Sequence, residues 1–183
     1  AERAALAESN PARALADEIL DYGEMFGVKS VWAVGGDGWA YDIGFGGLDE
    51  VLASGENINV LVLDTEGYSN TGGEMSKATE LSSVSGFTLD GKPTPRKDLG
   101  RMMMQYDCVY VSQVCLGADM EQTIRALREA EAYDGPSIVI ALCPCISWGI
   151  KGGMSTNLRV AREGVRAGYW PLFRFNPMLA VAG

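Results

Sequence analysis

The chain has 183 residues, a hydrophobic content of 47%, a charged content of 21% and a formal net charge of −9. These values are typical of a globular domain. They exclude a membrane span, which needs about 18 uninterrupted apolar residues, and a general nucleic-acid binder, which needs a basic surface. The absence of histidine excludes Ser-His-Asp triads, Cys-His dyads and histidine metal sites.

The N-terminal segment carries scattered acidic residues and no apolar stretch, so we expect no signal peptide there. Four cysteines (Cys108, Cys115, Cys143 and Cys145) are too few and too irregularly spaced for a secreted disulfide framework. A reducing compartment is therefore expected. The second half of the chain is slightly basic, which predicts a solvated helix face or a face toward an acidic partner or the rest of a larger protein.

Hydrophobic periodicity predicts helices and strands in alternation along the chain. The expected helices are residues 1–26, with a break at Pro11, 40–54, 96–106, 119–133 and 156–167. The expected strands are residues 31–34, 58–63, 108–114, 137–142 and 170–175. This alternation predicts one α/β domain over residues 1–183, a doubly wound, mainly parallel sheet with helices on both faces. The polar loop 65–95 exceeds the usual loop length, which indicates a functional or disordered segment.

In sheets of this kind, ligands bind beyond the carboxyl ends of the strands. The loop Gly35-Gly36-Asp37-Gly38 follows the first of these strands. Its glycines allow a ligand to approach the backbone, and the helix that follows can receive an anion. Asp37 would repel a bare phosphate, so we expect a cation between them, and Mg²⁺ prefers such oxygen donors. The G-x-G-x-x-G spacing of dinucleotide loops is absent.

The loop after the second strand supplies further oxygen donors. Thr65, Ser69, Asn70 and Thr71 have side-chain oxygens, and Gly67 can present an unhindered carbonyl. Either loop alone could be a set of capped turns, because these residue types favour turns. Together, after consecutive strands of one sheet, the two loops predict a metal-bound diphosphate site.

Gly36-Asp37-Gly38, followed after a helix and a strand by Asn70-Thr71, resembles the GDG…N motif that binds thiamine diphosphate. The longer string from Gly35 to Gly73, with PSIVIALCPCISWGI and GYWPLFRFNP, is similar to one branch of that family. The branch is the C-terminal thiamine diphosphate-binding domain of pyruvate:ferredoxin (flavodoxin) oxidoreductases, and the similarity covers about residues 28–177. The resemblance implies the thiamine diphosphate-binding α/β fold.

The resemblance also implies a role for each matching position. Asp37 and Thr65 would bind Mg²⁺ through their side chains, and Gly67 through its carbonyl. Relatives often carry a branched apolar residue in place of Gly67, a difference that leaves a carbonyl ligand intact. Relatives often carry Gln in place of Glu74, and the added negative charge bears on substrate preference.

Further positions are expected to contact the cofactor. The full set is Gly36, Asp37, Gly38, Trp39, Thr65, Gly67, Ser69, Asn70 and Thr71. Asn70 would lie near both cofactor and substrate, and is the candidate catalytic residue.

In the resembling family, the cysteine of C-I-x-x-G is one ligand of a four-iron four-sulfur cluster, and Cys145 matches it. From the residues alone, Cys143 and Cys145 could equally be small apolar residues at a strand end, and Cys108 and Cys115 could be core residues. A cubane cluster needs four thiolates. The other ligands, and the Glu that binds the aminopyrimidine, are therefore expected from the remaining domains of a longer polypeptide or from another chain.

The implied activity is the oxidative decarboxylation of pyruvate to acetyl-CoA, with coenzyme A as acetyl acceptor and electrons passed through the cluster to ferredoxin or flavodoxin. A homodimer is implied, in the cytoplasm or in an anaerobic energy organelle, without a nucleic-acid or membrane partner. Three alternatives remain open at this point: another 2-oxoacid, NADP as electron acceptor through a fused flavin module, and a detached cofactor-binding domain that is inactive alone.

Overall fold

The computed structural model describes residues 11–27 and 29–181. The chain divides into two compact units, Ala1–Ser30 and Val31–Gly183. In the first unit, helix α2 (Pro11–Asp21) is followed by the 3-10 turn η1 (Gly23–Phe26). The helix predicted for residues 1–10 lies outside the described residues.

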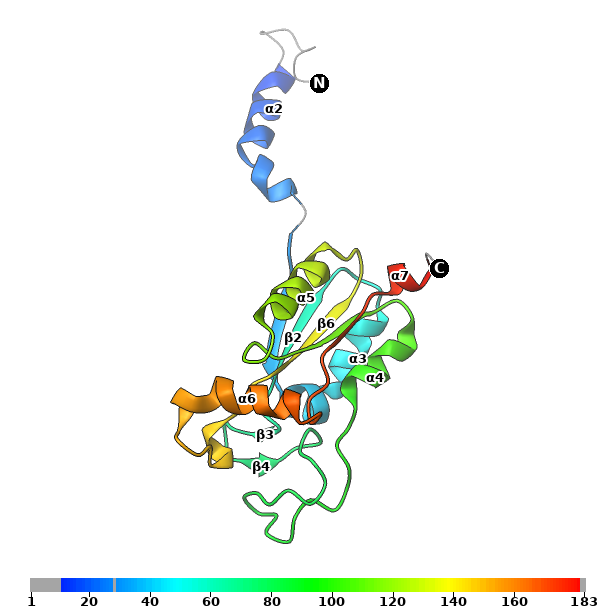
Figure 1. Ribbon diagram of the computed structural model, residues 1–183. Coiled ribbons are helices and arrows are strands. Elements are labelled where there is room, and N and C mark those ends of the chain that lie inside the picture. Colours follow the sequence, from blue (N-terminus) through cyan, green and yellow to red (C-terminus); the bar gives the residue numbers. More distant parts are fainter. Residues whose placement is uncertain (1–10, 28, 182–183) are drawn as a thin grey trace. The chain divides into compact units, whose positions relative to one another are not determined.

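The second unit is built on a five-stranded sheet with the strand order β1-β2-β6-β5-β7 (Figure 1). The strands are β1 (Trp32–Gly36), β2 (Asn59–Asp64), β5 (Tyr110–Val114), β6 (Ser137–Leu142) and β7 (Phe173–Phe175). β1, β2, β6 and β5 are parallel, and the short edge strand β7 runs antiparallel to β5. β2 and β6 lie in the interior of the sheet, where the continuous apolar runs of their sequences are required. The predicted mainly parallel sheet is confirmed.

Helices cover both faces of this sheet, as predicted. They are α3 (Phe45–Ala53), α4 (Leu99–Met103), α5 (Met120–Ala132) and α6 (Asn157–Arg166), and the short helix α7 (Pro177–Val181) follows β7. α3 and α4 pack on one face and α5 on the other (Figure 1). The first core includes Leu48, Leu52, Val60, Met103 and Ile138, and the second includes Tyr110, Ala126, Ala130 and Val139. Within the part of the chain that the structure describes, every helix is too short or too polar to cross a membrane.

The structure corrects three details of the expected elements. The helix expected at 40–54 is a π-helical turn η2 (Gly38–Ile43) and the separate helix α3, with Gly44 between them. A Cβ on Gly44 would lie 2.5 Å from the Trp39 ring, so only glycine permits this approach. β1 is an edge strand and is only partly buried, with Val34 58% exposed. The helix expected from residue 96 begins at Leu99, where the Asp98 side chain caps it.

The loops that follow the parallel strands leave the sheet at one edge. Gly36 at the end of β1 aligns with Leu63 of β2, and Asp64 at the end of β2 aligns with Leu142 of β6. The loop after β2 contains a small hairpin of β3 (Gly67–Tyr68) and β4 (Glu74–Met75), and the loop after β6 contains the 3-10 turn η4 (Ile146–Trp148). This shared edge brings the candidate site residues together.

Candidate functional site

Oxygen atoms from the first two loops meet at the edge of the sheet. The Thr65 Oγ1 atom lies 2.9 Å from Asp37 Oδ1 and 2.8 Å from the carbonyl oxygen of Gly67. The Ser69 Oγ atom lies 3.2 Å from the same hydroxyl. The structure therefore brings together the three groups that we expected to be metal ligands. Two of them, Asp37 and Thr65, are 28 positions apart in the chain.

The spacing of these oxygens fits Mg²⁺. In an octahedron with metal–oxygen distances of about 2.1 Å, neighbouring ligand oxygens lie about 3.0 Å apart. The distances from Thr65 Oγ1 to Asp37 Oδ1 and to the Gly67 carbonyl oxygen match this oxygen–oxygen separation. The Thr65 hydroxyl has one proton and so cannot donate to both Asp37 and Gly67 at once. The Thr65 oxygen therefore faces the oxygen of Asp37 or of Gly67 without a proton between them, and a bound cation would relieve the repulsion between their lone pairs.

A strained turn makes Thr65 and Gly67 converge. Glu66, between them, has a φ of 62°, which is unusual for a residue with a side chain. Its amide donates to Asp64 Oδ1 over 3.0 Å, which holds the turn at the end of β2. This one left-handed residue directs the Thr65 side chain and the Gly67 carbonyl to the same point.

Asp37 is nearly inaccessible to solvent, with 2% of its surface exposed. Its second carboxylate oxygen accepts a hydrogen bond from Ser76 Oγ over 2.5 Å. Burial raises the pKa of Asp37, while the hydroxyls of Ser76 and Thr65 act in the opposite direction. Ser76 was not among the predicted site residues. The only sequence signal for it was its place in the long polar loop 65–95, whose length indicated a functional or disordered segment.

Two glycines of the site lie directly under aromatic rings. A Cβ on Gly38 would lie 2.2 Å from the Tyr68 ring, and a Cβ on Gly67 would lie 2.2 Å from the Trp148 ring. Trp148 also donates from Nε1 to the Thr65 carbonyl over 2.7 Å. Trp148 is thus a second site residue that sequence reasoning missed, because its contact joins the loop after β6 to the loop after β2.

The remaining predicted cofactor contacts are spread around this cluster. Gly36 ends β1, and a Cβ there would meet nothing within 4 Å, which leaves open space beside the backbone. The Trp39 ring packs into the main core, so this side chain faces inward. Asn70 and Thr71 lie on an exposed turn outside the oxygen cluster, and Thr71 Oγ1 donates to Glu74.

The four cysteines do not gather into one site. Cys108 is exposed at the amino end of β5, whereas Cys115 is buried after its carboxyl end. Burial raises the pKa of the Cys143 thiol to about 11. Burial acts in the same direction on Cys145, but hydrogen bonds with Ser147 and Ser69 outweigh it and lower the pKa of the Cys145 thiol.

Within the described residues, no group of three or more His, Cys, Asp or Glu is arranged to hold a metal. The described cysteines therefore do not supply the four thiolates of a cubane cluster at one place. A cavity of about 440 Å³ lies between the loop that carries Cys143 and Cys145 and helix α6, and Thr65 also lines it. Its size falls in the range of small-molecule sites.

Comparison with known proteins finds a family model and a solved structure that this chain resembles. The family model for the thiamine pyrophosphate enzyme, C-terminal TPP binding domain, matches residues 22–141. A solved structure of 2-oxoglutarate:ferredoxin oxidoreductase from Magnetococcus marinus has a TM-score of 0.58 and 22% sequence identity, and the match covers 77% of this chain and 55% of the other. At that identity the likeness concerns the fold.

Relatives of known name match at much higher identity. Pyruvate:ferredoxin oxidoreductase of Moorella thermoacetica is 60% identical over 155 residues, which is 85% of this chain. Pyruvate-flavodoxin oxidoreductase of Klebsiella pneumoniae is 53% identical over 92% of the chain, and the pyruvate dehydrogenase (NADP+), mitochondrial, of Euglena gracilis is 50% identical over 98%. The chain spans 13%, 14% and 10% of the length of these three proteins.

Proposed function

Because this chain belongs to the family of C-terminal thiamine pyrophosphate-binding domains of thiamine pyrophosphate enzymes, we propose that it forms the Mg²⁺–thiamine diphosphate site of a 2-oxoacid oxidoreductase. The proposed reaction is the oxidative decarboxylation of pyruvate to acetyl-CoA, with ferredoxin or flavodoxin as electron acceptor. The named relatives carry this activity in their names.

One observation carries the proposal: the meeting of Asp37 Oδ1, Thr65 Oγ1 and the Gly67 carbonyl at octahedral spacing. A carboxylate, a hydroxyl and a backbone carbonyl leave half of an octahedron for other oxygens, and Mg²⁺ commonly fills such positions with substrate phosphates and water. The open backbone at Gly36, where a Cβ would meet nothing within 4 Å, leaves room for a diphosphate beside this metal.

The residues of this chain have positioning and electrostatic roles in the proposed reaction. Bound thiamine diphosphate supplies the carbon nucleophile and the electron sink that decarboxylation of a 2-oxoacid needs. Asp37, Thr65 and Gly67 hold the metal that neutralises the diphosphate, and this fixes where the reactive ring can lie. Ser69 and Asn70 belong to the same loop, and Asn70 is exposed where a substrate supplied by another domain would arrive.

Cys145 is the proposed ligand of a four-iron four-sulfur cluster, because hydrogen bonds with Ser147 and Ser69 lower the pKa of its thiol and because it lines the cavity beside Thr65. Three further thiolates must come from elsewhere in the enzyme. We further propose that the remaining domains, coenzyme A and a second copy of the enzyme complete the site, and that the homodimer is cytoplasmic. An organelle is the alternative, since the Euglena relative is named as mitochondrial.

Calorimetric titration of thiamine diphosphate into the full-length protein tests this proposal, with Mg²⁺ and with the metal removed by chelation. We expect binding only with Mg²⁺, and we expect Asp37→Asn to abolish the metal-dependent part. Asp90→Asn is the matched control, because it removes an exposed carboxylate of the long loop and should leave binding unchanged. Binding that is indifferent to both Mg²⁺ and Asp37 would contradict the site.

NADP is the second candidate electron acceptor. The Euglena relative, named for NADP+, aligns with 98% of this chain, which is more than the alignment with the Moorella relative covers. The two-loop site would be the same with either acceptor. Assays of the full-length protein with pyruvate and coenzyme A, comparing ferredoxin, flavodoxin and NADP+, separate the two candidates.

A further inference from the structure

We propose that Arg96 is a positioning residue that holds the loops of the metal site in register. This inference rests on the proposed Mg²⁺–thiamine diphosphate site, but it concerns a side chain that lies behind the ligands. The Arg96 side chain is only 16% exposed, and its guanidinium contacts the turn after β2, the π-helical turn after Asp37 and the backbone near Ser76.

The first contact is with the loop after β2. Arg96 Nη2 forms an ion pair with Asp64, whose side chain is fully buried at the end of the strand. Arg96 Nη1 lies 3.3 Å from Glu66 Oε1, which belongs to the strained residue between the two proposed ligands. The guanidinium therefore holds both flanks of Thr65.

Two further contacts of Arg96 reach the turn that follows Asp37 and the segment that carries Ser76, the hydrogen-bond donor to Asp37. Arg96 Nη2 donates to the hydroxyl of Tyr41 over 3.2 Å, and Tyr41 lies in the π-helical turn that directly follows Asp37. Arg96 Nη1 donates to the Ala78 carbonyl over 2.8 Å, two residues after the Ser76 that donates to Asp37. One side chain thus ties together the supports of every proposed metal ligand.

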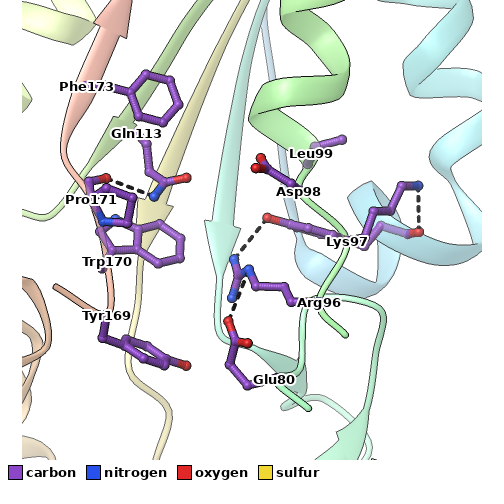
Figure 2. A pocket seen from close by; sticks show the side chains of 11 residues that line it. Glu80, Arg96, Lys97, Asp98, Leu99, Gln113, Tyr169, Trp170, Pro171 and Phe173 are labelled. Carbon is purple, nitrogen blue, oxygen red and sulfur yellow. Dashed lines mark hydrogen bonds and ion pairs between the residues drawn. The ribbon is translucent and has the colours of Figure 1, made fainter. Parts of the chain in front are cut away.

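Charge and shape explain why an arginine serves here. Burial alone would lower the pKa of Arg96, but the nearby Asp64, Tyr41 and Glu66 outweigh it and raise the pKa, so the side chain stays charged. The planar guanidinium also lies over the Trp170 ring, 4.9 Å from its centroid. Figure 2 shows Arg96 pointing toward Glu80, with Trp170 and Tyr169 across the pocket.

The Glu66 carboxylate has a second partner, because Tyr169 donates to it from the segment before β7. Without the guanidinium, Asp64 and Glu66 would be two carboxylates without a cation in direct contact. Their repulsion would open the turn that directs Thr65 and Gly67 to one point. The expected consequence is a weaker metal site in which every proposed ligand residue is still present.

The test is a titration of Mg²⁺ into full-length protein at a fixed concentration of thiamine diphosphate, with cofactor binding followed by calorimetry. For Arg96→Gln we expect the Mg²⁺ concentration at half-saturation to rise about 10-fold to 100-fold, the range usual for residues that support metal ligands. Arg96→Lys retains the charge opposite Asp64 but loses the forked geometry that also reaches Glu66, Tyr41 and Ala78, so it should recover only part of the affinity. Arg174→Gln is the matched control, because Arg174 is also ion-paired and partly buried, but with Glu129 on α5.

Two further measurements keep the test decisive if Arg96→Gln folds poorly. The variant Arg96→Gln with Asp64→Asn removes the charges of both partners of the buried ion pair, so Asp64 no longer repels Glu66, and we expect a rise in Mg²⁺ requirement that is smaller than for Arg96→Gln alone. Arg96→Ala should be partly rescued by millimolar methylguanidinium, since Arg96 lines a solvent-accessible cavity of about 270 Å³.

The outcomes separate the two proposals. If the unaltered protein binds thiamine diphosphate with Mg²⁺ and the Arg96 variants show the same Mg²⁺ requirement, the positioning role is overturned and the proposed function stands. If the unaltered protein shows no Mg²⁺-dependent binding, the proposed function fails and the inference fails with it.

Discussion

The indole of Trp148 closes over Gly67 and donates a hydrogen bond of 2.7 Å to the carbonyl of Thr65. Trp148 belongs to the loop after β6, three residues beyond Cys145, whereas Thr65 and Gly67 belong to the loop after β2. The proposed cluster ligand and the proposed metal ligands are therefore on loops that touch each other directly. With the Trp148 ring in this position, a Cβ on residue 67 would overlap it, so any other residue type requires the ring or the loop to shift.

This contact makes Gly67→Ala a sensitive substitution. The new Cβ would lie 2.2 Å from the Trp148 ring and 2.8 Å from the Glu74 carbonyl oxygen, so the loop must shift and carry the Gly67 carbonyl with it. We expect Mg²⁺-dependent binding of thiamine diphosphate to weaken about 10-fold, as when other supports of metal ligands are disturbed. Titration calorimetry measures this change.

Trp148→Ala provides the partner variant for this experiment. Combined with Gly67→Ala it removes the closer of the two clashes, so the double variant should bind better than Gly67→Ala alone. Gly46→Ala is the control, because a Cβ there meets nothing within 4 Å and the residue lies in α3, where Ala is a better helix former. Equal binding by Gly67→Ala and the unaltered protein would show that the ring does not constrain the loop.

The sequence predicted those parts of the fold that depend on local patterns. β2 and β6 are continuous apolar runs, and such runs occur where a parallel strand is buried on both faces. The meeting of the loops after β1 and β2 also followed from sequence, because loops after parallel strands share one edge of the sheet. The choice of Asp37, Thr65 and Gly67 within those loops came from the family resemblance.

The supporting residues could not be predicted in this way. Arg96 lies 32 residues from Asp64, and Trp148 lies 83 residues from Thr65, so their contacts exist only in the folded chain. Neither residue type by itself indicates a functional site, since Arg is usually a surface residue and Trp usually a core residue. The break at Gly44 was missed for a related reason: it depends on the Trp39 ring packing against that glycine.

Tyr41→Phe should destabilise the chain without changing its core packing. The Tyr41 hydroxyl donates to Asp64 Oδ2 over 2.6 Å and accepts from Arg96, and both partners are buried or nearly so. Loss of a hydrogen bond to a buried charged group costs about 1.5–3 kcal/mol. Urea denaturation of the 183-residue chain at neutral pH measures the change in the free energy of unfolding.

Tyr106→Phe is the matched control for that measurement. Its hydroxyl also donates to a carboxylate over 2.6 Å, that of Asp49, but at a site open to solvent. Water can replace the lost partner there, so the effect should be smaller than for Tyr41→Phe. If the two variants were equally stable, the burial of the Tyr41 hydrogen bonds would add nothing to the free energy of unfolding.

Lys92 organises the long loop from the inside. It is only 4% exposed, and its Nζ donates to the carbonyls of Thr79, Lys77 and Pro95 over 2.5, 3.4 and 3.3 Å. Lys92→Met fills a similar volume but leaves these carbonyls without their donor, which costs about 1–3 kcal/mol for each one that stays buried. We expect faster cleavage within residues 77–95 in limited proteolysis with chymotrypsin.

Lys151→Met is the control for the proteolysis experiment, since Lys151 is exposed in the loop after β6. Neither substitution removes a chymotrypsin cleavage site, so a difference in rate reports on opening of the loop. Cleavage of Lys92→Met at the rate of the control would mean that the loop is held by its other contacts alone.

Cys145 and Cys143 should differ in reactivity although they are two residues apart. Burial raises the pKa of Cys143 to about 11, so at pH 8 only about one Cys143 in a thousand is a thiolate. The pKa of Cys145 is lowered, because its hydrogen bonds with Ser147 and Ser69 outweigh burial. The thiolate is the nucleophile in alkylation, so iodoacetamide should modify Cys145 first in protein freed of iron and sulfide.

The pH dependence of the alkylation rate shows whether the pKa of each of these two cysteines is raised or lowered. Between pH 7 and pH 9 the Cys143 rate should still rise about tenfold per pH unit, because the thiol remains far below half-ionisation. The Cys145 rate should level off within or below this interval, since its thiol is ionised at lower pH than an ordinary cysteine. Peptide mapping by mass spectrometry follows both sites in one sample. A Cys145 rate that rises in parallel with that of Cys143 up to pH 9 would contradict the lowered pKa, and with it the argument that this thiol is prepared to bind a metal.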